Sequence, residues 1–235
     1  MAEDDFDVDS LAVFLHVTPA QVEKMASRGK IPGRKIGGSW RFARAEIHHW
    51  FEDKIGLADG EGLREMQQML ERYDSHPEQE RLPISELLPE HQILLPLNGR
   101  TKNSVIDTVC QFAGDLGLLW DPNKMADAIR ARESLHPTAL ESGVALMHPR
   151  RPLSNLMADP FLILGRTQSG IPFGGPRGCL TDLFFLIASV DDAGHLRVLT
   201  QLSRLITNGE TVSQLRMAES AAEVFEIIVS AEREL

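Results

Sequence analysis

Residues 133–150 of this 235-residue chain read Glu-Ser-Leu-His-Pro-Thr-Ala-Leu-Glu-Ser-Gly-Val-Ala-Leu-Met-His-Pro-Arg. The preceding residues 125–132 are rich in Ala and Arg and predict a helix. The apolar run 143–147 predicts a short strand that presents His148 at its end. Imidazole is a nucleophile at neutral pH, and a strand end holds the ring in place. His148 is therefore the first candidate functional residue.

This arrangement resembles the phosphoryl-accepting loop of the enzyme IIA domains of the phosphoenolpyruvate-dependent phosphotransferase system, of the fructose, mannitol and nitrogen-regulatory class. In that family an Arg-Glu pair closes a helix, a loop rich in Thr and Gly follows, and a Gly-Val-Ala-Ile-Pro-His strand carries the phosphorylated histidine. The similarity extends from about residue 87 to residue 235. Three positions depart from the pattern: Met147 stands where a proline is usual, and Ala139-Leu140 stand where glycines are usual.

The resemblance implies a role for each of three residues. His148 would be the nucleophile and carrier, receiving its phosphoryl group from an HPr-type donor. Arg132 stands where the family has its helix-terminal arginine and would balance the charge of that group. His195 stands where the family keeps a second histidine and would stabilise the group by hydrogen bonding. The apolar spacing of residues 196–206 predicts a helix with His195 at its N-terminus, where backbone N–H groups favour an anion.

Such a domain would be a phosphocarrier in a relay rather than a turnover enzyme. Two alternatives stay open from the residues themselves, because a histidine at a strand end is often a surface residue and an arginine near a helix end often complements the helix dipole. In the first, the domain is a non-phosphorylated sensor whose pocket binds an anion or a partner. In the second, it is a sugar-transport IIA component with an appended DNA-binding unit, although no enzyme IIB or IIC segment is recognised in these residues.

Residues 6–53 carry a second pattern. Thr18 followed by Pro19 is a typical helix start, and the pair Gly37-Gly38 is typical of a tight turn between two strands. We expect two helices, a two-stranded wing and a closing helix at residues 11–15 (capped by Asp9 or Ser10), 19–27, 34–42 and 45–53.

This second pattern resembles the excisionase-type winged helix-turn-helix, a relative of the MerR DNA-binding domain. Its most specific part is the run 28–42, Arg-Gly-Lys-Ile-Pro, a basic strand and Gly-Gly-Ser-Trp-Arg-Phe. Charge supports the resemblance, because residues 24–44 hold basic side chains and no acidic one in a chain of net charge −10.

The partner implied by this module is double-stranded DNA. The second helix of the fold enters the major groove, and the wing reaches phosphates or the minor groove. The residues that would make these contacts are Thr18, Gln21, Lys24 and Arg28 on the helix, and Arg34, Lys35, Ser39 and Arg41 on the wing. A solvated basic face or a protein-interaction module is the alternative.

Length and motif order predict a DNA-binding domain over residues 1–55, a linker over 56–84 and the enzyme IIA-like domain over 85–235. Residues 63–73 have helical spacing and form either a connector or a helix that pairs two chains into a homodimer, whereas residues 74–82 are the expected flexible stretch. In the last domain strands alternate with helices, which predicts an α/β layered fold with a mixed sheet flanked by helices. The predicted strands are 91–97, 143–147, 161–166 and 180–190; the predicted helices are 101–116, 121–132, 194–206, 210–216 and 220–231.

Several site classes are not expected. The glycines at 165–178 form no dinucleotide fingerprint, and residues 171–174 instead resemble the family's loop between strands. Cys110 and Cys179 have neither pair nor metal spacing, so no metal site and no cofactor are expected and a reducing cytoplasm is favoured. No apolar run has the length of a membrane span and the start has no signal-peptide character, which predicts a cytoplasmic protein without membrane insertion.

Overall fold

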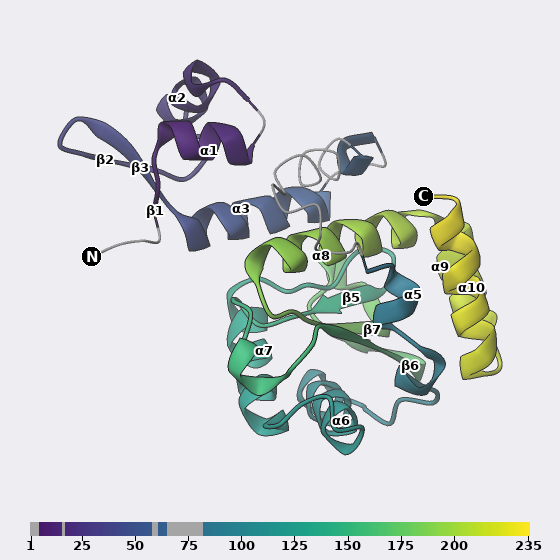
Figure 1. The fold of residues 1–235 in the computed structure, drawn as a ribbon. Helices are drawn as coiled ribbons and strands as arrows, with labels where there is room; N and C mark the ends of the chain where they lie inside the picture. Colours follow the sequence, from purple (N-terminus) through teal and green to yellow (C-terminus); the bar gives the residue numbers. More distant parts are fainter. Residues whose placement is uncertain (1–4, 16, 58–60, 65–81) are drawn as a thin grey trace. The chain divides into compact units, whose positions relative to one another are not determined.

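The computed structural model describes residues 5–15, 17–57, 61–64 and 82–235. The chain divides into two compact units, Met1–Glu80 and Arg81–Leu235 (Figure 1). Residues 61–64 are helical, whereas the rest of the predicted connector helix and residues 74–81 of the predicted flexible stretch lie outside the described residues. Among the helices described, none combines the length and the apolar character that a membrane span requires.

The first unit is a small helical domain with a wing. Its three-stranded antiparallel sheet has the order β1-β3-β2. Gly37 and Gly38 both have positive φ and form the turn between β2 and β3, as their sequence predicts. The elements are β1 (Asp5–Phe6), α1 (Val8–Phe14), α2 (Pro19–Ser27), β2 (Arg34–Ile36), β3 (Ser39–Ala43) and α3 (Arg44–Leu57).

The first helix starts earlier than predicted, because neither Asp9 nor Ser10 is its N-cap. Asp7 takes that position and its carboxylate accepts from the Ser10 N–H at 2.8 Å. The Ser10 hydroxyl accepts in return from the Asp7 N–H at 2.9 Å. Ser10 is thus the third helical residue of a capping box, and this reciprocal bond outweighs its own preference for the cap position.

The second unit is built on a mixed sheet, as predicted, and its four strands have the order β4-β6-β7-β5. Its two long strands, β6 (Phe161–Pro172) and β7 (Leu180–Ala188), are antiparallel. The short strands β4 (Ile93–Leu94) and β5 (Val144–Met147) lie outside them and run parallel to β6 and β7 respectively. The helices are α5 (Ile84–Leu87), α6 (Lys102–Asp115), α7 (Pro122–Leu135), α8 (Asp192–Thr207), α9 (Gly209–Met217) and α10 (Ala221–Arg233).

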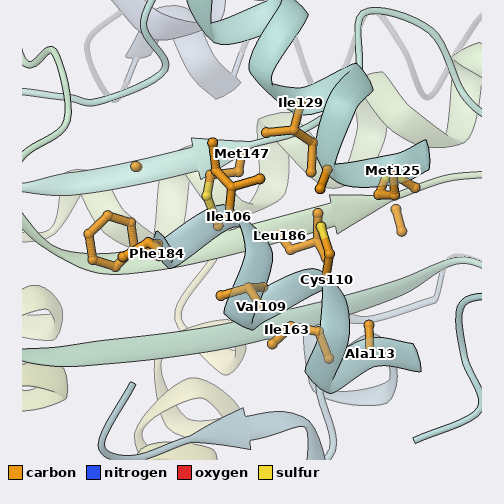
Figure 2. Packing of buried hydrophobic residues seen from close by; sticks show 14 of the residues in the cluster. Ile106, Val109, Cys110, Ala113, Met125, Ile129, Met147, Ile163, Phe184 and Leu186 are labelled. Atoms are coloured by element: carbon orange, nitrogen blue, oxygen red, sulfur yellow. The ribbon is translucent and has the colours of Figure 1, made fainter. Parts of the chain in front are cut away.

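Helices cover both faces of this sheet. In Figure 1, α6 and α7 lie on one face and α8 on the other, which is the layered arrangement that the alternation of elements predicts. Figure 2 shows the core under α6 and α7, where Ile106 and Ile129 meet Met147 and Phe184 of the sheet. All four side chains are fully buried.

Two strands differ most from their predicted bounds, whereas β5 begins one residue later than predicted and β7 ends two residues earlier. In the segment predicted as a strand over 91–97, β4 covers Ile93–Leu94, because Pro96 has no N–H to give to a ladder and His91 lies in a 3-10 turn, η1 (Glu90–Gln92). Conversely, β6 continues to Pro172 after a register shift between Arg166 and Ile171. Residues 171–172, which resemble the family's loop, therefore still belong to the strand.

Candidate functional site

Strand β5 sets the direction of His148. Successive side chains on a strand point to opposite faces, and Ala145 and Met147 of β5 belong to the core under α6 and α7. Leu146 and His148, which directly follows the strand, alternate with these two residues and therefore face the α8 side of the sheet. The sequence therefore places the imidazole on the side of the sheet where the second histidine begins its helix.

A backbone carbonyl fixes the tautomer of His148. Its Nδ1 lies 2.8 Å from the carbonyl oxygen of Leu146. A carbonyl oxygen accepts and cannot donate, so Nδ1 carries the hydrogen and Nε2 of the neutral ring carries the lone pair. The nucleophilic nitrogen of this ring is consequently Nε2.

His195 lies beside His148. The two ring centroids are 4.8 Å apart, with the planes inclined at 54°. His195 is the fourth residue of α8 rather than the first, because the helix begins at Asp192 and Asp191 is its N-cap, with its side chain accepting from the Gly194 N–H at 2.8 Å. The structure thus brings the two histidines together, whereas His195 lies two residues further into the helix than the predicted start at residue 194 implies.

The loop before β5 runs back along it. Thr138 O accepts from the Leu146 N–H, and Leu140 N–H donates to Val144 O at 2.8 Å. Ala139 and Ala145 form an isolated antiparallel bridge between these bonds. These bonds hold the loop after α7 against the strand that leads to His148.

Arg132 reaches the start of that loop. Helix α7 continues to Leu135, so Arg132 lies in its last turn rather than at its end. Its guanidinium is buried and Nη1 donates to the His136 carbonyl at 2.7 Å. This bond ties a buried cation to the start of the loop that pairs with β5.

Glu133 holds the same loop from inside the domain. Its side chain is 1% exposed and accepts from the Lys102 ammonium at 3.1 Å. It also accepts from the hydroxyl of Thr138 and, at 3.2 Å, from the Thr138 N–H. A buried carboxylate with these partners fixes the loop to both α6 and α7. Glu133 belongs to the Arg-Glu pair that resembles the family's, but it was not among the predicted site residues. Nothing in the sequence pointed to Lys102, which is 31 residues away.

A second loop packs against the first. Gly174 has a φ of 102°, and a Cβ placed there would lie 2.8 Å from Cβ of Pro137. The Lys102 ammonium lies 4.9 Å from the ring centre of Phe173, the preceding residue. Glycine is required at 174 both by its backbone and by the close approach of Pro137.

The predicted DNA-contacting residues of α2 fall into two groups. Thr18 and Gln21 form the capping box of the helix, with the Gln21 side chain accepting from the Thr18 N–H at 2.8 Å. These side chains therefore have a structural role as well as an exposed position. Lys24 and Arg28, one on the helix and one at its C-cap, are exposed.

The predicted wing residues mostly have partners within the unit. Arg34 forms an ion pair with Asp5 at 3.0 Å, and Arg41 pairs with Asp7 at 3.8 Å. The Lys35 ammonium lies 5.2 Å from the ring centre of Trp40. Ser39, at the start of β3, is exposed. The acidic partners of the two arginines were missed by sequence reasoning, which counted charge over residues 24–44.

Both halves of the chain match known families. Residues 86–231 match the model of the phosphoenolpyruvate-dependent sugar phosphotransferase system, EIIA 2, and residues 6–54 match a helix-turn-helix domain. The fructose-specific EIIABC component of the phosphotransferase system of Bacillus subtilis is 32% identical over 149 residues, which are 63% of this chain. Those residues span 23% of that protein.

Two further similar proteins are nitrogen regulatory proteins. A nitrogen regulatory protein of Bradyrhizobium diazoefficiens is 26% identical over 151 residues, covering 63% of this chain and 95% of that protein. The crystal structure of the nitrogen regulatory protein IIA-Ntr of Neisseria meningitidis is similar with a TM-score of 0.55 and 25% identity, covering 62% of this chain and 98% of that one. The chain belongs to the EIIA 2 family of the phosphoenolpyruvate-dependent sugar phosphotransferase system and carries a helix-turn-helix domain at its N-terminal end.

Proposed function

We propose that this chain is a DNA-binding regulator whose EIIA domain accepts a phosphoryl group on His148 from an HPr-type phosphocarrier. The observation that carries the proposal is the bond between His148 Nδ1 and the Leu146 carbonyl. It makes Nε2 the nucleophile without a separate general base.

In the transfer, the Nε2 lone pair forms the new phosphorus–nitrogen bond while the phosphorus–nitrogen bond of the donor phosphohistidine breaks. The phosphoryl group moves as a unit. The proton stays on Nδ1, which continues to donate its hydrogen bond to the Leu146 carbonyl. The added group brings roughly two negative charges at neutral pH, by analogy with other phosphoresidues. Arg132 would balance these charges, and His195 would donate a hydrogen bond to a phosphoryl oxygen.

Two contacts support these roles. The 4.8 Å separation of the histidine rings brings His195 within reach of a group on His148. The bond from Arg132 to the His136 carbonyl holds a buried guanidinium at the start of the loop that pairs with the strand before His148. Preorganised donors of this kind stabilise a phosphoryl group during its transfer.

Phosphotransfer assays test the proposal. The full chain is incubated with labelled phosphoenolpyruvate, enzyme I and HPr, as wild type, His148→Ala and His195→Ala. We expect acid-labile labelling of the wild type, none of His148→Ala, and slower transfer or faster loss of label for His195→Ala. His91→Ala is the control and should keep its labelling, because this exposed histidine lies in the η1 turn and has no role in the candidate site. A wild type that takes no label would favour the anion-sensing alternative.

We also propose that the first unit binds double-stranded DNA through α2 and the wing. Support comes from the exposed basic side chains Lys24, Arg28, Arg34 and Lys35 in a match to a helix-turn-helix domain. Phosphate contacts make the affinity fall with salt, by a slope of about one unit for each contact.

The DNA-binding test uses the full chain and genomic fragments at several salt concentrations. Arg28→Ala is expected to weaken binding and to lower the salt slope by about one unit. Arg233→Ala, a charge-matched change at the end of α10 in the EIIA domain, is expected to alter neither. Absence of salt-sensitive binding by the wild type would remove this part of the proposal.

A further inference from the structure

An acidic arm lies against the wing. The arm consists of Asp5, Phe6 and Asp7, and its strand β1 pairs antiparallel with β3, with Phe6 opposite Phe42. Phe6 is buried, with its ring centroid 5.2 Å from that of Phe14. The arm is therefore anchored by both a strand ladder and an aromatic contact, rather than lying loosely on the surface.

This anchoring directs both carboxylates at the basic wing. Side chains alternate along an extended segment, so Asp5 and Asp7 point away from the face that buries Phe6. The Asp5 carboxylate lies 3.0 Å from the Arg34 guanidinium, and the Asp7 carboxylate lies 3.8 Å from that of Arg41. The two arginine side chains are still 62% and 43% exposed, which leaves them accessible to a competing anion.

We propose that Asp5 and Asp7 are specificity-determining residues. Their carboxylates bind the wing arginines where the phosphates of bound DNA would otherwise bind. The inference rests on the proposed DNA binding. A phosphate that contacts Arg34 or Arg41 must first displace a carboxylate. This lowers the affinity for the sugar-phosphate backbone, which is the same in every sequence, while contacts from α2 to base edges are unaffected.

The size of the effect follows from the exposure of the pairs. Exposed ion pairs of this kind are weak, so removing each one is expected to raise the affinity for non-specific DNA roughly two- to five-fold at low salt. The salt slope is expected to steepen by up to about one unit for each aspartate removed, because an unpaired arginine releases a full counterion equivalent from the DNA.

The experiment compares three charge-matched variants of the full chain: Asp5→Asn, Asp7→Asn and Asp9→Asn. Asparagine at position 7 keeps the N-cap, because its side-chain oxygen still accepts from the Ser10 N–H. Asp9 is exposed on the same helix turn and forms no ion pair among the described residues. It therefore controls for the general effect of one lost negative charge.

Binding to a random-sequence duplex is measured from about 50 to 200 mM salt, with circular dichroism melting to verify the fold. We expect Asp5→Asn and Asp7→Asn to bind more tightly and with a steeper slope than Asp9→Asn. In a double-mutant cycle, Arg34→Gln should cost more affinity in the Asp5→Asn background than in the wild type.

Equal affinities and slopes for the three variants would overturn the inference while leaving the proposed DNA binding in place. Absence of binding by the wild type and by all variants would overturn both. Asp5→Asn could instead lower the melting temperature while Arg34→Gln costs the same affinity in both backgrounds. The arm would then serve only the fold, and this too contradicts the inference.

Discussion

Replacing Thr138 by valine removes one link that holds the loop before β5. The Thr138 hydroxyl donates to the Glu133 carboxylate, whose side chain is 1% exposed. Valine keeps the shape at this position but cannot donate, so the buried carboxylate loses one of its partners. The Thr138 N–H and the Lys102 ammonium remain.

The magnitude follows from the type of bond. Hydrogen bonds to charged groups contribute about 1.5–3 kcal/mol, and the half-buried position of Thr138 favours the lower end. About 1.5 kcal/mol in a unit of this size corresponds to a fall in melting temperature of roughly 3–6 °C. Phosphotransfer should slow as well, since the loop that carries the His136 carbonyl to Arg132 is held less firmly.

Scanning calorimetry of the full chain measures the first effect, and the rate of labelling by phosphorylated HPr measures the second. Thr108→Val is the matched control, because its hydroxyl donates to neutral backbone carbonyls of Ser104 and Asn98 in and beside α6. That variant should lose about 1 kcal/mol or less and keep its transfer rate. Equal transfer rates for Thr138→Val and Thr108→Val would refute the reasoning.

Three further predictions concern the two cysteines and the core of the second unit. Burial raises the pKa of the Cys110 thiol to about 12, so at pH 8 iodoacetamide should label half-buried Cys179 and leave Cys110 unlabelled, as read by peptide mass spectrometry. Because the folded state holds the Cys110 proton more tightly than the unfolded state does, this thiol stabilises the fold fully at pH values below its ordinary pKa of 9.0. That stabilisation is lost as the pH rises from there toward about 12. Ile129→Ala should cost about 2–5 kcal/mol in urea unfolding, whereas Ile129→Val should cost about 0.5–1.5 kcal/mol; similar losses for both would contradict the close packing around this side chain.

Features set by local signals were predictable from the sequence. Helix α2 has the predicted bounds, because Thr18 and Pro19 mark its start and Gly29, with positive φ, follows its end. The strand that ends before His148 was predictable in the same way, since its apolar run and the flanking glycine and proline are contiguous. Met147 was identified as a departure from the family pattern, and its side chain is fully buried in the core under α6 and α7.

Features that depend on distant pairing were not predictable. The bond from Lys102 to Glu133 joins α6 to α7 through two residues that are 31 positions apart, and no local sequence pattern predicts it. The ion pair from Arg34 to Asp5 requires β1 to join the wing sheet, although a two-residue strand has too few side chains for a periodic signal. The continuation of β6 to Pro172 likewise depends on distant pairing, because its last residues pair with β7 after a register shift.

The chemical form of the phosphorylated protein tests the central claim most directly. Phosphorus and nitrogen NMR of the full chain, labelled on its histidines and phosphorylated through HPr, identifies which nitrogen of which histidine carries the group. The bond from Nδ1 to the Leu146 carbonyl predicts a phosphoryl group on Nε2 of His148. Phosphorylation at Nδ1, or on any histidine other than His148, would contradict the account.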